Sequence, residues 1–110
     1  MENKRKFPRF ETAFQVKYCP EHNNRLSSYT IASDVSRGGL RIPIPSGIIN
    51  KGDAINLDMK TNDGKRHILA IGIVKWLKSI NRNAPLDEEA GIEFVETNPS
   101  DIDRLIKSNK

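Results

Sequence analysis

The feature that most constrains the fold of this chain is an alternation of apolar and polar residues with a period of two. Ile55, Leu57 and Met59 share one parity in residues 54–60, and polar residues stand between them. Successive side chains of a strand point to opposite faces, so this segment is expected to bury one face and expose the other. The same alternation in residues 12–18 predicts a second strand of this kind.

Four further segments have the composition of strands. They are residues 28–34, residues 40–44 after the Gly38-Gly39 pair, residues 67–77 and residues 91–95. Residues 67–77 are apolar on both parities, and Gly72 in their middle predicts a bulge that lets one long strand serve two faces. An Asn62-Asp63-Gly64 turn signal predicts a hairpin that joins the strands on either side of it.

The end of the chain is predicted to be a helix that begins at about residue 99. Asn98 is a favourable capping residue and Pro99 suits the first helical position. Asp101 and Asp103 lie near the positive end of the helix dipole, and an apolar stripe follows at Ile102, Leu105 and Ile106. Six strands and one closing helix predict an all-β-dominated fold, a small antiparallel β-barrel with a C-terminal α-helix packed on it.

The size and composition of the chain narrow the function classes. Its 110 residues suit one domain, predicted to be a barrel over residues 11–110 preceded by an arm. We find no apolar run long enough to cross a bilayer and no signal-peptide core, so we expect a cytoplasmic protein without membrane insertion. A single Cys19 excludes an internal disulfide, and two histidines, His22 and His67, predict no metal site.

The positive charge of the chain is concentrated at its N-terminus. The formal net charge is +4, and Lys4, Arg5, Lys6 and Arg9 against Glu2 give the first nine residues +3 of it. This polar segment is interrupted by Pro8, so residues 1–10 are predicted to be a mobile arm. A basic arm on a nearly neutral body points to an anionic partner.

Two local motifs stand out against this background. The arm contains an R-x-x-x-R sequence from Arg5 to Arg9, and a D-x-S-x-x-G sequence runs from Asp34 through Ser36 to Gly39 at a predicted connection between strands. With these two motifs in this order, and with the Val74-Lys75-Trp76 strand, the Gly91–Phe94 strand and the terminal helix, nearly the whole chain resembles the PilZ domain family.

This resemblance implies a six-stranded antiparallel barrel with a C-terminal helix, found in bacteria, that binds bis-(3′-5′)-cyclic dimeric GMP (cyclic di-GMP) through the two motifs. The residue chemistry fits such a ligand. Arg5 and Arg9 can donate paired hydrogen bonds to guanine O6 and N7 or to phosphate oxygens. Asp34 can accept from guanine N1–H and the 2-amino group, and Ser36 adds a small hydroxyl. Gly38 and Gly39 would permit a tight backbone between the strands and a close approach of the ligand, with no Cβ in the way.

Other residues are assigned with an alternative beside them. Additional ligand contacts are considered for Lys4, Lys6, Arg37, Gly38 and Trp76, although charged residues of this kind are commonly solvated and a tryptophan is commonly a core residue. Asp34 and Ser36 could equally hold a local turn through backbone hydrogen bonds. Arg41 and His67 are interpreted as ordinary surface residues, and Asp87, Glu88 and Glu89 as a solvated loop.

The sequence therefore favours a cyclic di-GMP receptor or adaptor without a cofactor, which orders its arm on binding and signals to a separate protein partner. Whether it takes one ligand or an intercalated pair stays open. One alternative is a single-stranded nucleic-acid binding module, which the nearly neutral body and the lack of an aromatic strand face disfavour. Another is a protein-interaction domain without ligand. An enzyme is not expected, because no catalytic grouping of side chains is visible.

Overall fold

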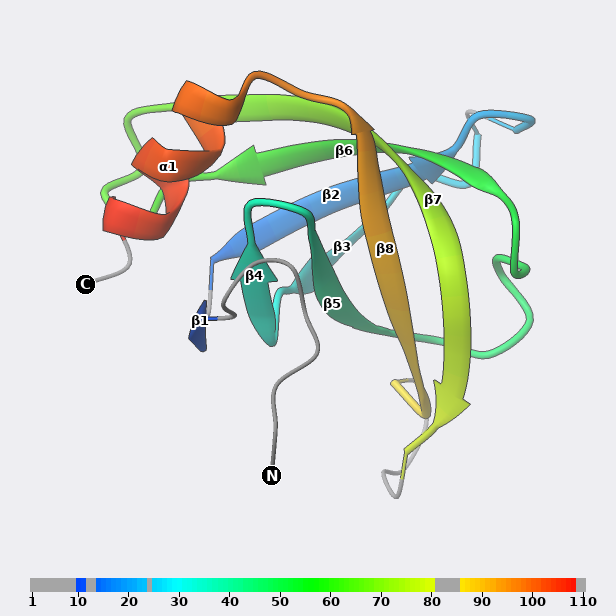
Figure 1. Cartoon of the computed structure of the whole chain (residues 1–110). Coiled ribbons are helices and arrows are strands. Elements are labelled where there is room, and N and C mark those ends of the chain that lie inside the picture. The colour runs from blue at the N-terminus through cyan, green and yellow to red at the C-terminus, as the bar shows by residue number, and fades with distance from the viewer. Residues whose placement is uncertain (1–9, 12–13, 24, 81–85, 109–110) are drawn as a thin grey trace, which may run out of the picture.

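The computed structural model describes residues 10–11, 14–23, 25–80 and 86–108 (Figure 1). These form eight strands and one helix: β1 (Phe10–Glu11), β2 (Gln15–Pro20), β3 (Ser28–Ile31), β4 (Asp34–Ser36), β5 (Gly39–Ile44), β6 (Ala54–Lys60), β7 (His67–Ser79), β8 (Glu88–Glu96) and α1 (Pro99–Ser108). The strands make one antiparallel sheet in the order β1-β4-β5-β8-β7-β6-β2-β3. The predicted all-β class with one C-terminal helix is confirmed.

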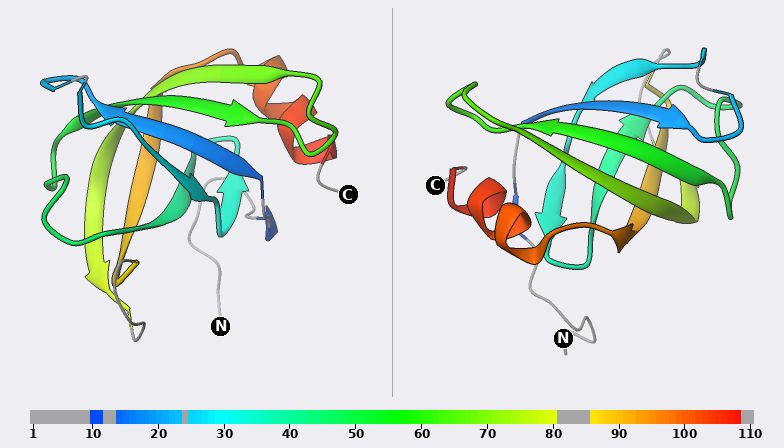
Figure 2. Two further views of the ribbon diagram at one scale, coloured as in Figure 1. Left: turned by 180° about the vertical axis from the view of Figure 1, so that it is seen from behind. Right: turned by 90° about the horizontal axis from the view of Figure 1, so that it is seen from above.

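The sheet curls because one short stretch of chain belongs to both of its ends. Strand β3 is the last strand at one edge and β4 is the second strand from the other, yet only Ala32 and Ser33 separate them. Ala32 N–H donates to the Phe14 carbonyl, whereas Ser33 N–H donates to the Arg41 carbonyl, so the chain changes partners within two residues. The Thr30 hydroxyl, on β3, donates to the Pro43 carbonyl of β5 at 2.6 Å. The two ends of the sheet therefore lie together, as both views of Figure 2 show.

The predicted count of six strands is wrong, because the chain changes its pairing partner at Ala32 and Ser33. The expected strand over residues 28–34 breaks into β3 and β4 where it crosses from one end of the sheet to the other. A separate short strand, β1, pairs with β4, and β2 begins only at Gln15. Alternation predicts which side chains share a face, but it carries no information on where a strand changes its partner.

The core lies inside the curled sheet and is closed at one end by α1. Ile55, Leu57 and Met59 are all buried, as their shared parity predicts. The helix buries Ile102, Leu105 and Ile106 against the sheet, and Figure 1 shows it across the end of strands β6 and β7. Its start is capped as predicted, because the Asn98 side-chain carbonyl accepts from the Ser100 N–H at 2.9 Å.

Strand β7 contains the predicted irregularity and a second one. Its register against β8 shifts between Ile71 and Gly72, which confirms the bulge expected at Gly72, and shifts again between Val74 and Trp76. Before the second shift Val74 points into the core, opposite Ile92; after it, Trp76 stands opposite Gly91. Two residues of equal parity therefore point to different faces. The second bulge removes Trp76 from the core.

Candidate functional site

The D-x-S-x-x-G motif forms the hairpin between β4 and β5. Asp34 pairs with Arg41 and Ser36 pairs with Gly39, so Arg37 and Gly38 are the two residues of the turn. Asp34 and Ser36 both lie on the face of β4 opposite the core residue Val35, and they are 5% and 8% exposed. The sequence-predicted pair is therefore brought together on one face of one short strand.

Ser36 also holds the turn itself. Its hydroxyl oxygen accepts from the Gly38 N–H at 3.1 Å, and the hydroxyl is 3.4 Å from the Gly39 carbonyl oxygen, to which it donates. The Gly38 carbonyl in turn accepts from the Phe94 N–H of β8 at 2.8 Å. The local-turn interpretation of Ser36 is thus correct as geometry, and the turn is anchored to the neighbouring strand.

The interpretation of Arg41 as an ordinary surface residue is wrong. Its Nη2 atom lies 2.6 Å from Asp34 Oδ2, and its Nη1 atom lies 3.4 Å from Glu89 Oε1 of β8. The Ser33 hydroxyl lies 3.4 Å from the other oxygen of Glu89. Glu88 and Glu89 belong to strand β8, which corrects the prediction that these two residues are part of a solvated loop. A two-residue turn at Arg37-Gly38 places residue 41 opposite residue 34, and this register was the signal that could have found the pair.

Asp87 lies in the loop before β8, as predicted, but its carboxylate has partners. Its carboxylate accepts from the Ser46 N–H at 2.9 Å and from the Ser46 hydroxyl at 3.1 Å. The backbone hydrogen bond from Ser46 is the main cause that lowers the pKa of Asp87 below its ordinary value. This contact ties the turn after β5 to the segment that leads into β8.

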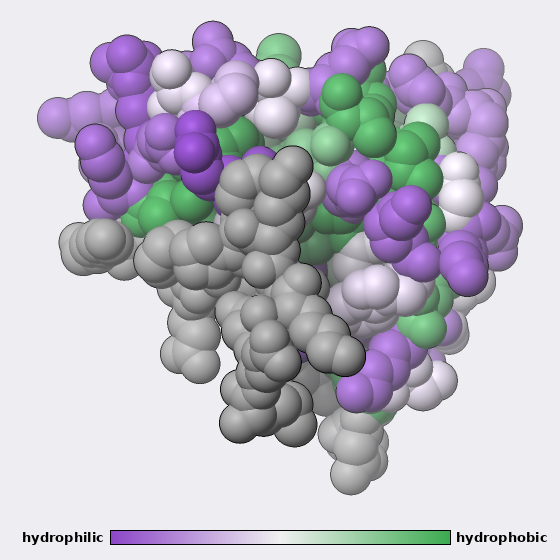
Figure 3. Space-filling view, in the orientation of Figure 1, coloured by the Kyte–Doolittle hydropathy of each residue, from purple (hydrophilic) through white to green (hydrophobic). Residues whose placement is uncertain are grey.

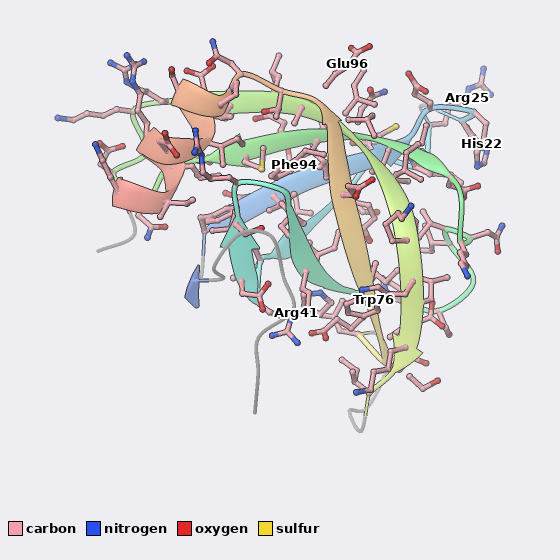
Figure 4. All side chains as sticks on the ribbon, viewed as in Figure 1. His22, Arg25, Arg41, Trp76, Phe94 and Glu96 are labelled. Atoms are coloured by element: carbon pink, nitrogen blue, oxygen red, sulfur yellow. The ribbon has the colours of Figure 1, made fainter. Side chains whose placement is uncertain are left out.

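A row of paired residues extends the hairpin across the sheet. Asp34 stands opposite Arg41, Arg41 opposite Gly91, and Gly91 opposite Trp76. A Cβ at Gly91 would meet the Trp76 indole at 2.1 Å, so the half-buried indole occupies the space that a side chain would take. Figure 4 shows the labelled Arg41 and Trp76 side chains in this region of the sheet. We call the outer surface of β4, β5 and β8, with Trp76, the hairpin face.

Gly39 allows the hairpin to pack closely against β8. A Cβ at this position would lie 2.1 Å from the carbonyl oxygen of Ile92 in β8. The tight backbone expected at this glycine is therefore present, and its contact with a ligand stays a prediction. Gly39 brings the turn and β8 together, with Ser36 of β4 on one side of it and Glu93 of β8 on the other.

The remaining predicted contacts fall into two groups. Arg37 is half exposed and its Nε atom lies 3.1 Å from Asp103 Oδ1, so it links the turn to α1 rather than standing alone in solvent. Four expected site residues, Lys4, Arg5, Lys6 and Arg9, lie outside the described residues, as does the expected arm apart from Phe10.

A concavity lies on another outer surface of the sheet. A cavity of about 590 Å³ opens over β2, β6 and β7, and its lining includes Lys17, Cys19, Asp58, Leu69, Ile71 and Glu96. Leu69 is 69% exposed there. We call this surface the groove face. Hydrophobic side chains are also visible in Figure 3 where β7 and β8 meet. None of the predicted ligand contacts that the structure describes lines the groove face.

Within the described part of the chain, no three His, Cys, Asp or Glu side chains are arranged to hold a metal ion. The same residues include no helix that is long and apolar enough to span a membrane.

Comparison with known proteins adds an independent line of evidence. The family model described as PilZ domain matches residues 3–108. A search of the curated proteins finds no match. Among solved structures, the Bacillus subtilis inhibitor of motility (MotI/DgrA) superposes with a TM-score of 0.78 at 17% identity. The match covers 96% of this chain and 49% of that one, so this chain spans about half the length of MotI/DgrA.

Two further structures have similar lengths to this chain. The PilZ domain of YcgR from Escherichia coli, solved with c-di-GMP, matches at a TM-score of 0.67 and 11% identity, covering 96% of this chain and 88% of that one. The PilZ domain of CeSA from a cellulose-synthesizing bacterium matches at 0.66 and 10% identity, covering 91% and 95%. At these identities the likeness is one of fold.

Proposed function

Because this chain belongs to the PilZ domain family, we propose that it is a receptor for cyclic di-GMP, with the ligand bound between the β4–β5 hairpin and the N-terminal arm. The observation that carries the proposal is the placement of Asp34 and Ser36 side by side on one face of β4, at the turn of a complete D-x-S-x-x-G motif. Five residues are proposed as ligand contacts: Arg5, Arg9, Asp34, Ser36 and Gly39.

The chemistry of the ligand matches these groups. Cyclic di-GMP presents two phosphates, the O6 and N7 acceptors of guanine and the N1–H and 2-amino donors. Arg5 and Arg9 supply forked donors for the acceptors and the phosphates. The Asp34 carboxylate supplies acceptors for the donor edge. Because Asp34 and Ser36 are nearly buried, neighbouring side chains or backbone have to move before a ligand can contact them. Lys4, Lys6, Arg37, Gly38 and the Trp76 indole, in the row that begins at Asp34, are proposed as additional contacts.

The arm is proposed to be the element that responds. If its residues 5–9 are disordered without ligand, ordering them costs roughly 5–10 kcal/mol, at about 1–2 kcal/mol per residue. Several charge-assisted hydrogen bonds of about 1.5–3 kcal/mol each can offset this cost, so we expect moderate affinity coupled to ordering of the arm. The ordered arm changes the surface that a separate partner protein would read. In this proposal the chain acts in the cytoplasm by binding and not by catalysis.

Isothermal titration calorimetry with cyclic di-GMP, and with linear GMP as the control nucleotide, tests the proposal. We expect saturable binding of the cyclic dinucleotide, much weaker binding of GMP, and a stoichiometry that distinguishes one ligand from an intercalated pair. Arg9→Ala and Asp34→Ala should each weaken binding by roughly tenfold or more, the loss expected for one or two charge-assisted hydrogen bonds. Undiminished binding in both variants would exclude the proposed contacts, and no binding by the unaltered protein would exclude the function.

Amide exchange tests the arm separately. Exchange of amides in residues 5–9 should slow when cyclic di-GMP is added at saturation. Equal exchange with and without the ligand would show that the arm is not the responding element, even if binding itself is confirmed.

A further inference from the structure

The guanidinium of Arg41 lies between two carboxylates that are largely removed from solvent. Its two terminal nitrogens lie 2.6 Å from Asp34 and 3.4 Å from Glu89, and the exposed fractions of the two carboxylate side chains are 6% and 14%. Arg41 itself is more accessible, at 34%. The three side chains come from three adjacent strands, β4, β5 and β8, so the sheet fixes their spacing.

The charges of this group pose a problem for a dianionic ligand. Asp34 and Glu89 carry two negative charges and Arg41 carries one positive charge, so the group as a whole has a net charge of −1. Without Arg41, the two carboxylates would present a net charge of −2 to a ligand with two phosphates. The electrostatic repulsion would oppose binding. Among the described residues, Arg41 is the cation that pairs with both carboxylates and offsets part of their negative charge.

Arg41 and a guanine are expected to share Asp34 rather than compete for it. The donor edge of guanine consists of neutral N–H groups. If a guanine displaced Arg41, a nearly buried carboxylate would exchange a charged partner for a neutral one, which is unfavourable where water is excluded. A carboxylate has several acceptor positions on its two oxygens, so it can accept from a guanidinium and a base at once. The Nε atom of Arg41 is buried and has no hydrogen-bond partner among the described residues, which leaves the guanidinium a further donor.

We propose that Arg41 is a positioning residue of the ligand site, whose guanidinium fixes the orientation of the Asp34 carboxylate and thereby contributes to the selection of guanine. This inference rests on the proposed function, because it assigns to Asp34 the donor edge of a guanine. It adds a residue outside the two sequence motifs and a reason for its presence. Glu89 is the second carboxylate that contacts the guanidinium and helps to fix its position.

The experiment compares cyclic di-GMP with its inosine analogue, cyclic di-IMP, which lacks the 2-amino groups. The unaltered protein should bind cyclic di-GMP roughly tenfold or more tightly than the analogue, as expected when a hydrogen bond to a charged acceptor is lost. Arg41→Lys keeps the positive charge but loses the forked geometry. We expect it to weaken cyclic di-GMP binding about tenfold and to reduce the preference for guanine to within about threefold. Arg104→Lys, the same change on an exposed residue of α1, should alter neither quantity.

Several results would overturn the inference. If Arg41→Lys keeps both the affinity and the preference, the residue does not position Asp34. If it weakens both ligands by the same factor, Arg41 contributes to affinity but not to the selection of guanine. If the unaltered protein binds cyclic di-GMP without preferring it to the analogue, Asp34 does not read the 2-amino group. Absence of any binding by the unaltered protein would instead reject the proposed function.

A measurement on the unaltered protein covers the case in which Arg41→Lys does not fold. The Arg41 Nε–H resonance can be followed by NMR during titration with cyclic di-GMP. We expect a resonance protected from solvent exchange both before and after saturation, because Nε is buried and the guanidinium stays in place while Nη2 remains paired with Asp34. Loss of that protection on ligand binding would show that guanine displaces Arg41, and would overturn the inference.

Discussion

The hairpin face and the groove face are outer surfaces of the same sheet, but their charged side chains differ in how far they are buried. On the hairpin face, Asp34 and Glu89 are largely buried and both contact Arg41. On the groove face, Leu69 stands in solvent, and the pair of Asp58 with His67, whose Oδ1 and Nδ1 atoms are 2.7 Å apart, is substantially exposed. A charge that is removed from water needs a partner of opposite charge to be stable. An exposed ion pair contributes little to the free energy of unfolding, so breaking it costs little. Substitutions on the hairpin face should therefore cost far more than those on the groove face.

The largest loss is expected from Arg41→Ala. It would leave two nearly buried carboxylates without the guanidinium that pairs with both, and we expect a loss of about 2–4 kcal/mol in the free energy of unfolding. This range is below that of a fully buried pair, because Arg41 is one-third exposed and water screens part of the interaction. Urea unfolding measures the loss, with Arg104→Ala as the exposed control. A loss within about 0.5 kcal/mol would remove the distinction between the two faces.

Substitution of two glycines of the hairpin face is expected to give smaller losses in the free energy of unfolding. The Cβ of Gly39→Ala would meet a backbone carbonyl oxygen, so strands must separate, and we expect a loss of about 1–3 kcal/mol. The Cβ of Gly91→Ala would meet the Trp76 indole, a side chain that can turn away, so the loss should be smaller. Trp76 fluorescence should change in the second variant. Equal losses in both would contradict the distinction between backbone and side-chain contact.

The fold and the site differ in how far the sequence predicts them. Ile55, Leu57 and Met59 share a buried face because local alternation alone determines it, and Asn98 caps α1 through contacts within three residues. The break after Ile31 depends on which strands meet, and no local pattern carries that information. The pairing of Asp34 with Arg41 follows from the two-residue turn at Arg37-Gly38, whose register the sequence analysis did not use. The motif singled out Asp34 and Ser36, which lie on one face of β4, and their role as ligand contacts stays a prediction. It did not reveal Glu89, which reaches the site from a strand about fifty residues later.

On the groove face we expect little response to substitution. Leu69→Ser replaces a side chain that is 69% exposed, so the free energy of unfolding should change by no more than about 0.5 kcal/mol. Thermal and urea unfolding both measure this. A loss as large as that from Arg41→Ala would show that the groove face is packed in a way that its exposure does not indicate.

The smallest effect is one of pH, at the boundary of the hairpin face. Hydrogen bonds from Ser46, the backbone N–H first, lower the pKa of Asp87 below its ordinary value of 3.8. A lowered pKa in the folded state means that the stabilisation is fully present above about pH 4 and is lost as the pH falls through the lowered value. In Asp87→Asn the dependence of stability on pH below 4 should become less steep. An unchanged dependence would show that the Ser46 contact does not persist in solution.

The most direct test of the central claim is an NMR titration of the isotopically labelled protein with cyclic di-GMP. The claim places the ligand on the hairpin face and the arm, so the largest amide shifts should fall on residues 34–41 and residues 5–9. Amides of the groove face, such as those of Lys17, Asp58 and Leu69, should move little. Large shifts confined to the groove face, or no shifts at saturating ligand, would contradict the account.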